Sequence, residues 1–141
     1  MYIKVISHKA SAFPLSLGNP QAFLHSDLPK QVSEIIQQVR HWYVVLWRDE
    51  SMGLAGIKYR NSIQIIDLKH LKSATISFMK RAKGDGFVAF ELTMEHHLGY
   101  QTVFESPFFN PIALEWLITH QHEFEELLGC EIMVCDRGFD C

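Results

Sequence analysis

The stretch FVAFELTMEHHLGYQTVFES, residues 87–106, decides the fold, because it reads as two strands joined by a tight connection. Both halves are rich in aromatic and β-branched residues, which are typical of strands. A connection of four or five residues that contains glycine is typical of a β-hairpin. The stretch therefore predicts antiparallel pairing in this half of the chain.

A well-marked helix follows the hairpin. Asn110 is a preferred N-cap residue, Pro111 suits the first helical position, and Gly129 suits the residue after a helix. The segment between these signals is long enough for about five helical turns at ~3.6 residues per turn. The sequence therefore predicts one helix over residues 111–128.

The first half of the chain predicts a second helix and further strands. Apolar residues recur at helical spacing within about 28–40. The apolar residues of 68–83 fit both the helical period of ~3.6 residues and the strand period of ~2 residues. We expect a short helical turn near 67–71 followed by a strand over about 74–81. Residues 8–27 form a long apolar loop without a clear period, which we expect to pack across the domain or to cover a pocket.

These elements together predict an α+β fold: one domain over residues 1–141, with an antiparallel, meandering sheet of about six strands and two main helices packed on it. Gly53 and Gly56 interrupt one predicted strand and are expected to mark a bend or bulge. The strands before the last helix are similar in topology to a pleckstrin-homology-type arrangement. The N-terminal helix and the strand after the last helix depart from it, and topology alone implies no function.

The composition is ordinary for a globular protein, with 48% apolar and 21% charged residues. No run reaches the roughly 18 apolar residues that a membrane span needs, and we expect no membrane partner. Three cysteines do not suggest a disulfide framework, so we expect a cytoplasmic protein. The pI of about 6.2 argues against a dedicated nucleic-acid binder.

The charges are distributed unevenly along the chain. Residues 56–83 carry seven Lys or Arg against one Asp, whereas residues 84–141 carry eleven Asp or Glu against one Arg. Such asymmetry indicates a partner or self-association. The alternative is that folding spreads these charges over separate solvated faces.

The histidines are the candidate residues for metal binding or acid–base chemistry, but no established catalytic motif surrounds them. At ~100° per residue, His120 falls inside the apolar stripe of its helix, and His122 falls about 200° away, where it can pair with Glu126. These two imidazoles therefore cannot bind one ion together, and we predict no metal and no cofactor. The alternative metal site consists of Glu95, His96 and His97. If no metal binds there, the two histidines are turn residues of the hairpin.

The sequence favours a non-catalytic protein-binding module, such as an inhibitor or immunity-type protein, that turns its acidic C-terminal half toward a basic partner. The candidate binding residues are Phe108, Phe109, Glu115, His122, Glu123 and Glu126. The alternative is a small-molecule-binding domain or a small enzyme, with an aromatic pocket formed near His120, Trp116 and Tyr100. Self-association through the same surfaces is a third possibility.

Overall fold

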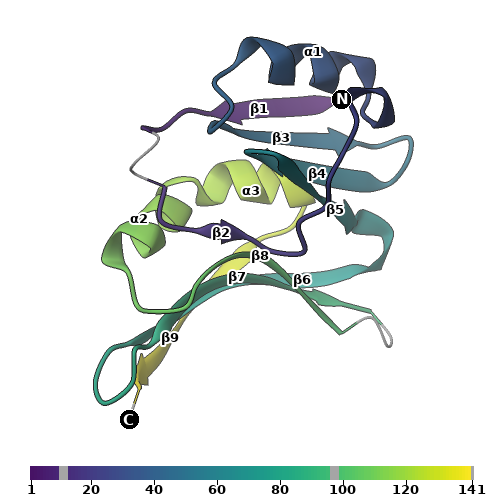
Figure 1. Ribbon diagram of the computed structural model, residues 1–141. Coiled ribbons are helices and arrows are strands. Elements are labelled where there is room, and N and C mark those ends of the chain that lie inside the picture. Colours follow the sequence, from purple (N-terminus) through teal and green to yellow (C-terminus); the bar gives the residue numbers. More distant parts are fainter. Residues whose placement is uncertain (10–12, 96–98, 141) are drawn as a thin grey trace.

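The computed structural model describes residues 1–9, 13–95 and 99–140. Within these residues the α+β class is confirmed, but nine strands form two sheets instead of one sheet of about six strands (Figure 1). The four-stranded sheet is antiparallel, with the order β1 (Tyr2–Ile6), β3 (Val44–Asp49), β4 (Leu54–Tyr59) and β5 (Ser62–Asp67).

The five-stranded sheet is mixed. Its order is β2 (Ser16–Leu17), β8 (Tyr100–Ser106), β7 (Phe87–Met94), β6 (Leu71–Lys80) and β9 (Ile132–Phe139). The predicted hairpin 87–106 is the pair β7 and β8. All neighbours are antiparallel except β6 and β9, which run parallel because a helical segment returns the chain before β9 begins.

The helices divide the molecule into layers. One apolar cluster joins α1 (Lys30–Gln38) to the outer face of the four-stranded sheet. The larger core lies between the sheets and includes side chains from α2 (Pro111–Thr119) and α3 (Gln121–Leu128). Figure 1 shows α3 between the two sheets and α2 beside it at their margin.

Two glutamines tie the sheets together. Gln64, on β5, is fully buried, and its Nε2 donates to the carbonyl oxygens of Gly18 and Thr102. Gln101, on β8, donates from Nε2 to the carbonyl oxygen of Ile65 at 2.9 Å. These bonds satisfy backbone carbonyls that lie outside their own ladders, and so fix β5 against β8.

The predicted single helix over 111–128 is wrong, because it breaks at His120 into α2 and α3. His120 has φ −102° and ψ 13°, outside the helical range. Ile118 and Thr119, just before the break, are β-branched and weaken a helix, while the contact of the His120 ring with that of Trp116, tilted by 53° at 4.9 Å, stabilises the bent form. The predicted cap and stop are confirmed: Asn110 Oδ1 accepts from Ile112 N at 2.9 Å, and Gly129 has φ 74°.

Other local predictions have mixed outcomes. A 3₁₀ turn, η3 (Leu68–His70), leads directly into β6, as expected for residues 67–81. The bulge expected at Gly56 is wrong, because its pairing with β3 and β5 is continuous. Gly56 instead leaves room for the indole of Trp47, as any Cβ there would lie 2.1 Å from that ring.

The described part of residues 8–27 packs across the domain, as expected. Leu15 is buried in the main core. The ring of Phe13 lies 4.4 Å from Tyr59 of β4 and 4.8 Å from Trp116 of α2, so it packs between the four-stranded sheet and α2. Among the described residues, no helix is long and apolar enough to cross a membrane.

Candidate functional site

The solvent side of α2 is apolar. Its segment PIALEWLIT contains one charged residue, Glu115, and already buries Ala113 and Leu117 against the core. A surface helix normally turns polar residues outward. Here Ile112 and Ile118 remain 62% and 45% exposed, and Phe108, just before the helix, remains 44% exposed. We call Phe108, Ile112, Glu115 and Ile118 the α2 face.

The structure separates the two predicted phenylalanines. Phe109 packs on the core, with its ring 6.1 Å from that of Phe78, and its backbone N–H donates to Asp85 O at 2.8 Å. Phe108 lies outside this packing and is available for contact.

A shallow hollow of about 280 Å³ adjoins the α2 face. Its lining consists of His8, Ile112, Glu115, Trp116 and Thr119. Within the part of the chain that the structure describes, the buried Nε1 of Trp116 has no hydrogen-bond partner. The α2 face is therefore not flat, and a partner's side chain has a place to insert.

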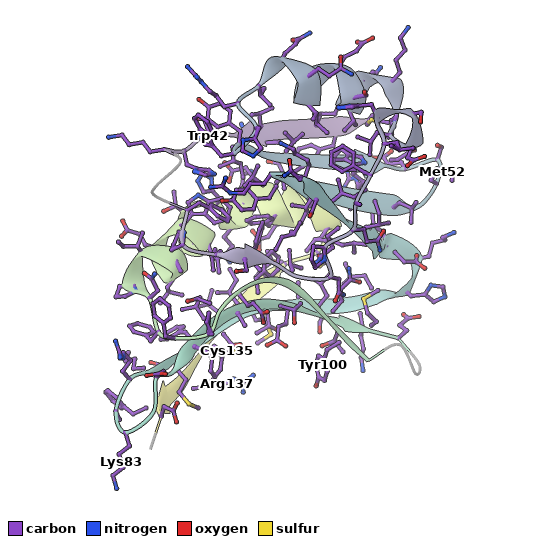
Figure 2. All side chains as sticks on the ribbon, in the orientation of Figure 1. Trp42, Met52, Lys83, Tyr100, Cys135 and Arg137 are labelled. Carbon is purple, nitrogen blue, oxygen red and sulfur yellow. The ribbon has the colours of Figure 1, made fainter. Side chains whose placement is uncertain are left out.

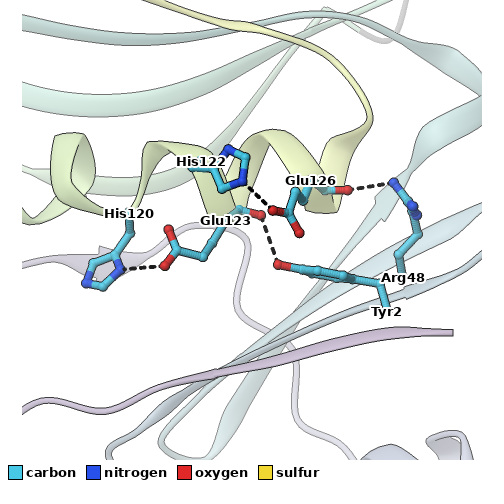
Figure 3. Close-up of polar contacts among 6 residues, drawn as sticks. All are labelled: Tyr2, Arg48, His120, His122, Glu123 and Glu126. Atoms are coloured by element: carbon cyan, nitrogen blue, oxygen red, sulfur yellow. Dashed lines mark hydrogen bonds and ion pairs between the residues drawn. The ribbon is translucent and has the colours of Figure 1, made fainter.

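The predicted acidic residues on α3 mainly serve the fold (Figure 3). The Glu123 carboxylate lies 3.5 Å from His120 Nδ1, and the Glu126 carboxylate lies 2.5 Å from His122 Nε2 in the predicted i, i+4 pair. The backbone carbonyls of the same two glutamates accept from the Tyr2 hydroxyl at 3.3 Å and from Arg48 Nη1 at 2.6 Å. These bonds attach α3 to β1 and β3.

The pKa values of two groups follow from this attachment. Burial raises the pKa of the Tyr2 hydroxyl, and the nearby carboxylates of Glu126 and Glu123 raise it further. Burial by itself would raise the pKa of Glu123, but hydrogen bonds from its own backbone N–H and from His120 outweigh it and lower that pKa.

The uneven charge of the sequence is partly matched inside the molecule. The parallel pairing of β6 with β9 places Lys80 Nζ 3.7 Å from Asp136 Oδ2. Glu125 accepts from Ile132 N at 2.9 Å, and Asp140 accepts from Gly86 N at 2.9 Å. The exposed carboxylates of this half that lie near the helices are those of Glu115, Glu126 and Glu131.

The aromatic pocket expected near His120 is largely filled. Trp116 packs on His120 in a tilted arrangement and meets Phe13 and Phe104 edge to face, at 4.8 and 5.7 Å. Tyr100 does not join them, because it lies exposed on the opposite, helix-free side of the five-stranded sheet (Figure 2).

A larger cavity, of about 540 Å³, lies on the outer face of the four-stranded sheet next to α1. It exists because α1, with nine residues, covers only part of that face. Its lining is mainly apolar and includes Phe23, Trp47, Leu54 and Ile65, with the carboxylates of Asp27 and Asp49. The expectation that residues 8–27 pack across the domain or cover a pocket fits this cavity, because Gln21, Phe23 and Asp27 line it. Its other walls come from segments far apart in the chain.

The described residues contain no group of three or more His, Cys, Asp or Glu that could hold a metal ion. His96 and His97, of the alternative metal site, lie outside the described residues. Glu95 is described, and its backbone N–H donates to His70 O at 2.7 Å. Comparisons of the chain with protein-family models, with curated proteins and with solved structures find no match.

Proposed function

We propose that this protein is a non-catalytic binding module that docks a basic protein partner on the α2 face. The observation that carries the proposal is the exposure of Ile112 and Ile118 on a helix that has already buried its other side, together with the exposure of Phe108 just before that helix. Three large apolar side chains are thus exposed within eleven residues of the chain, and exposed apolar surface of this kind is typical of protein contacts.

The energy available is adequate for a specific contact. Full burial of one such side chain stabilises a complex by about 1.5–3 kcal/mol, and these three are roughly half exposed. Three partial burials therefore supply about 3 kcal/mol, which is comparable to a small hot spot at the centre of an interface.

The carboxylates favour a basic partner. Glu115 lies within the α2 face, and Glu126 and Glu131 are exposed toward the end of α3 and just after it. Opposite charge on the partner accelerates encounter and makes association sensitive to salt. An acidic partner would meet repulsion from Glu115 on the α2 face.

The test is quantitative capture from an extract of the native host, with wild type, an Ile112→Gln/Ile118→Gln variant and a Met133→Gln control. Met133 is an exposed apolar residue on β9, away from α2. We expect wild type and the control to retain one basic partner. The double variant should recover at least about tenfold less of this partner, because a loss of about 1.4 kcal/mol in binding free energy lowers the affinity tenfold. Equal recovery on all three proteins contradicts the proposal.

A Glu115→Lys variant separates electrostatics from apolar contact. We expect its association rate with the captured partner to fall and its salt dependence to flatten, while the dissociation rate changes less. Sedimentation equilibrium of the isolated protein covers self-association, since a dimer abolished by Ile112→Gln/Ile118→Gln would make a second copy the occupant of the α2 face.

Small-molecule binding is the second candidate function, favoured by the 540 Å³ cavity at Trp47. Its volume lies within the ~300–1,000 Å³ typical of ligand sites. Apolar walls with two carboxylates suit an apolar amine. A thermal-shift panel of such amines, compared between wild type and Leu54→Trp, which fills the cavity, tests this function, and equal shifts in both proteins rule it out.

A further inference from the structure

Lys58 is a buried cation without a carboxylate partner. It lies on β4 beneath the C-terminal end of α1 and is only 2% exposed. Its Nζ donates one hydrogen bond, to His41 O at 2.7 Å, which leaves two of three N–H donors for another acceptor. Among the described residues, no Asp or Glu forms an ion pair with it.

Lys58 borders a cavity of about 330 Å³ whose polar lining can donate hydrogen bonds throughout. The lining consists of Phe23, His25, Ile36, Gln37, His41, Lys58, Arg60 and Asn61. It includes a lysine, an arginine, two imidazoles and two carboxamides, and no carboxylate. In a protein of net charge −3, a cavity with this lining selects for anions.

Local contacts orient two of these groups. Ser33 Oγ accepts from Gln37 Nε2 at 3.3 Å and lies 3.1 Å from His25 Nδ1. The serine hydroxyl can donate to His25 Nδ1, and in that tautomer the ring Nε2 carries the proton and serves as a donor. Arg60 donates from Nε to the Tyr59 hydroxyl at 3.0 Å, and its guanidinium lies 5.4 Å from the centre of that ring.

The backbone of Arg60 adds an independent observation. Arg60 has φ +53°, in the left-handed region that favours glycine or asparagine. Asn61, one residue later, would suit this conformation better. The chain therefore places an arginine at a turn position where the backbone conformation is unfavourable for a residue with a side chain, and this arginine borders the cavity.

We propose that this cavity binds the phosphate group of a small molecule, with Lys58 and Arg60 as the charged donors and His25 as a third donor. Lysine acts on phosphate as a point charge, and the arginine fork supplies parallel N–H donors. The side chains of Phe23 and Ile36 form the apolar wall against which the rest of the ligand lies. The site is separate from the α2 face, and neither depends on the other.

Burial also lowers the pKa of Lys58. A bound dianion would reverse this effect, because opposite charge stabilises the ammonium form. The cavity therefore gains most from a ligand that carries more than one negative charge.

The experiment uses inorganic phosphate as the probe, with sodium chloride and sodium acetate at matched ionic strength. Binding is followed by calorimetry and by the shift of Tm. We expect phosphate to bind and raise Tm, and chloride to have no comparable effect. An acetate effect equal to that of phosphate would overturn the assignment to phosphate, and an equal chloride effect would overturn the site itself.

The decisive variant is Arg60→Asn, because asparagine relieves the left-handed backbone while removing the guanidinium. Without phosphate its Tm should equal or exceed that of wild type. Its phosphate affinity should nevertheless fall about 10- to 100-fold, as expected for a lost charge-assisted hydrogen bond. A merely structural Arg60 would not separate stability from binding in this way.

The matched control is Lys72→Gln, which removes one exposed cation of β6 outside the cavity. It should bind phosphate as wild type does. Lys58→Met should abolish binding if it folds, and Arg60→Asn keeps the proposal testable if it does not. Undiminished phosphate affinity in Arg60→Asn, or an equal loss in Lys72→Gln, refutes the site.

Discussion

Replacement of Gly56 by alanine tests how α1 is attached to the four-stranded sheet. A Cβ at Gly56 would lie 2.1, 2.3 and 2.7 Å from Cζ2, Cε2 and Cη2 of Trp47. Trp47 packs in the cluster that joins the sheet to Val32 and Ile36 of α1, and it also lines the 540 Å³ cavity, so the indole can move aside only by giving up those contacts. The added methyl group must therefore displace the ring, the strand or the helix.

The expected cost follows from these distances. Carbon atoms pack best at about 3.5–4.0 Å, so the ring must move by more than ~1 Å in a close-packed layer. Overpacking of this kind costs about 1–3 kcal/mol, and three clashing atoms place Gly56→Ala near the upper value. Alanine recovers about 0.5–1 kcal/mol of backbone entropy in the unfolded chain. We expect a net loss of about 2 kcal/mol in the free energy of unfolding.

Urea unfolding followed by far-ultraviolet circular dichroism measures this loss without relying on indole fluorescence. The control is the same substitution in a Trp47→Leu background, where the ring is absent and Gly56→Ala should cost less than about 0.5 kcal/mol. A coupling energy of ~1–2 kcal/mol between the two sites is expected for residues in direct contact. An equal cost of Gly56→Ala in both backgrounds would refute the reasoning.

Two further predictions concern the packing of the core and the change of the free energy of unfolding at acid pH. Phe124→Ala should lower the free energy of unfolding, measured in urea, by about 3–5 kcal/mol. The reason is that Phe124 is fully buried and its ring lies 5.0 Å from Phe90 and 5.8 Å from Trp116. A cost below about 1 kcal/mol would contradict the position of α3 between the sheets. The hydrogen bond from His70 holds the pKa of Asp67 below its usual value, so its contribution to stability is complete above the unfolded pKa near 3.8 and is lost as pH falls through the lower, folded pKa. Asp67→Asn, which keeps an oxygen for the N–H of Lys69, should therefore flatten stability against pH below about pH 4; an unchanged slope would show that the pair with His70 has no part in acid unfolding.

Much of the local structure could be predicted because it depends on neighbours in the sequence. The cap at Asn110, the stop at Gly129 and the pair His122–Glu126 each involve residues within four positions of one another. The turn and strand within 67–81 likewise follow from the β-branched Thr75 and Ile76 and from the turn residues after them. The α+β class follows from the order of such elements.

The candidate site was only partly predictable. Phe108 could be named but not separated from Phe109, because one packs on Phe78 of a different strand. Ile112 and Ile118 are not among the predicted site residues, although the sequence contains a signal for them: the apolar side chains of 111–119 cover more than the ~100° stripe that one buried face needs. The Lys58 cavity has no local sequence signal, since its walls come from three separate stretches of the chain, residues 23–25, 36–41 and 58–61.

The sequence by itself determined the α+β class, the hairpin 87–106, the cap and stop of the last helical segment and which side chains are apolar, because these depend on propensity and on spacing along the chain. Only the tertiary structure decided that the strands divide into two sheets, that β9 runs parallel to β6 and brings Asp136 to Lys80, and that the last helix bends at His120. The physical reason is that strand pairing and burial depend on contacts between residues far apart in the chain, whose free energy no local pattern records.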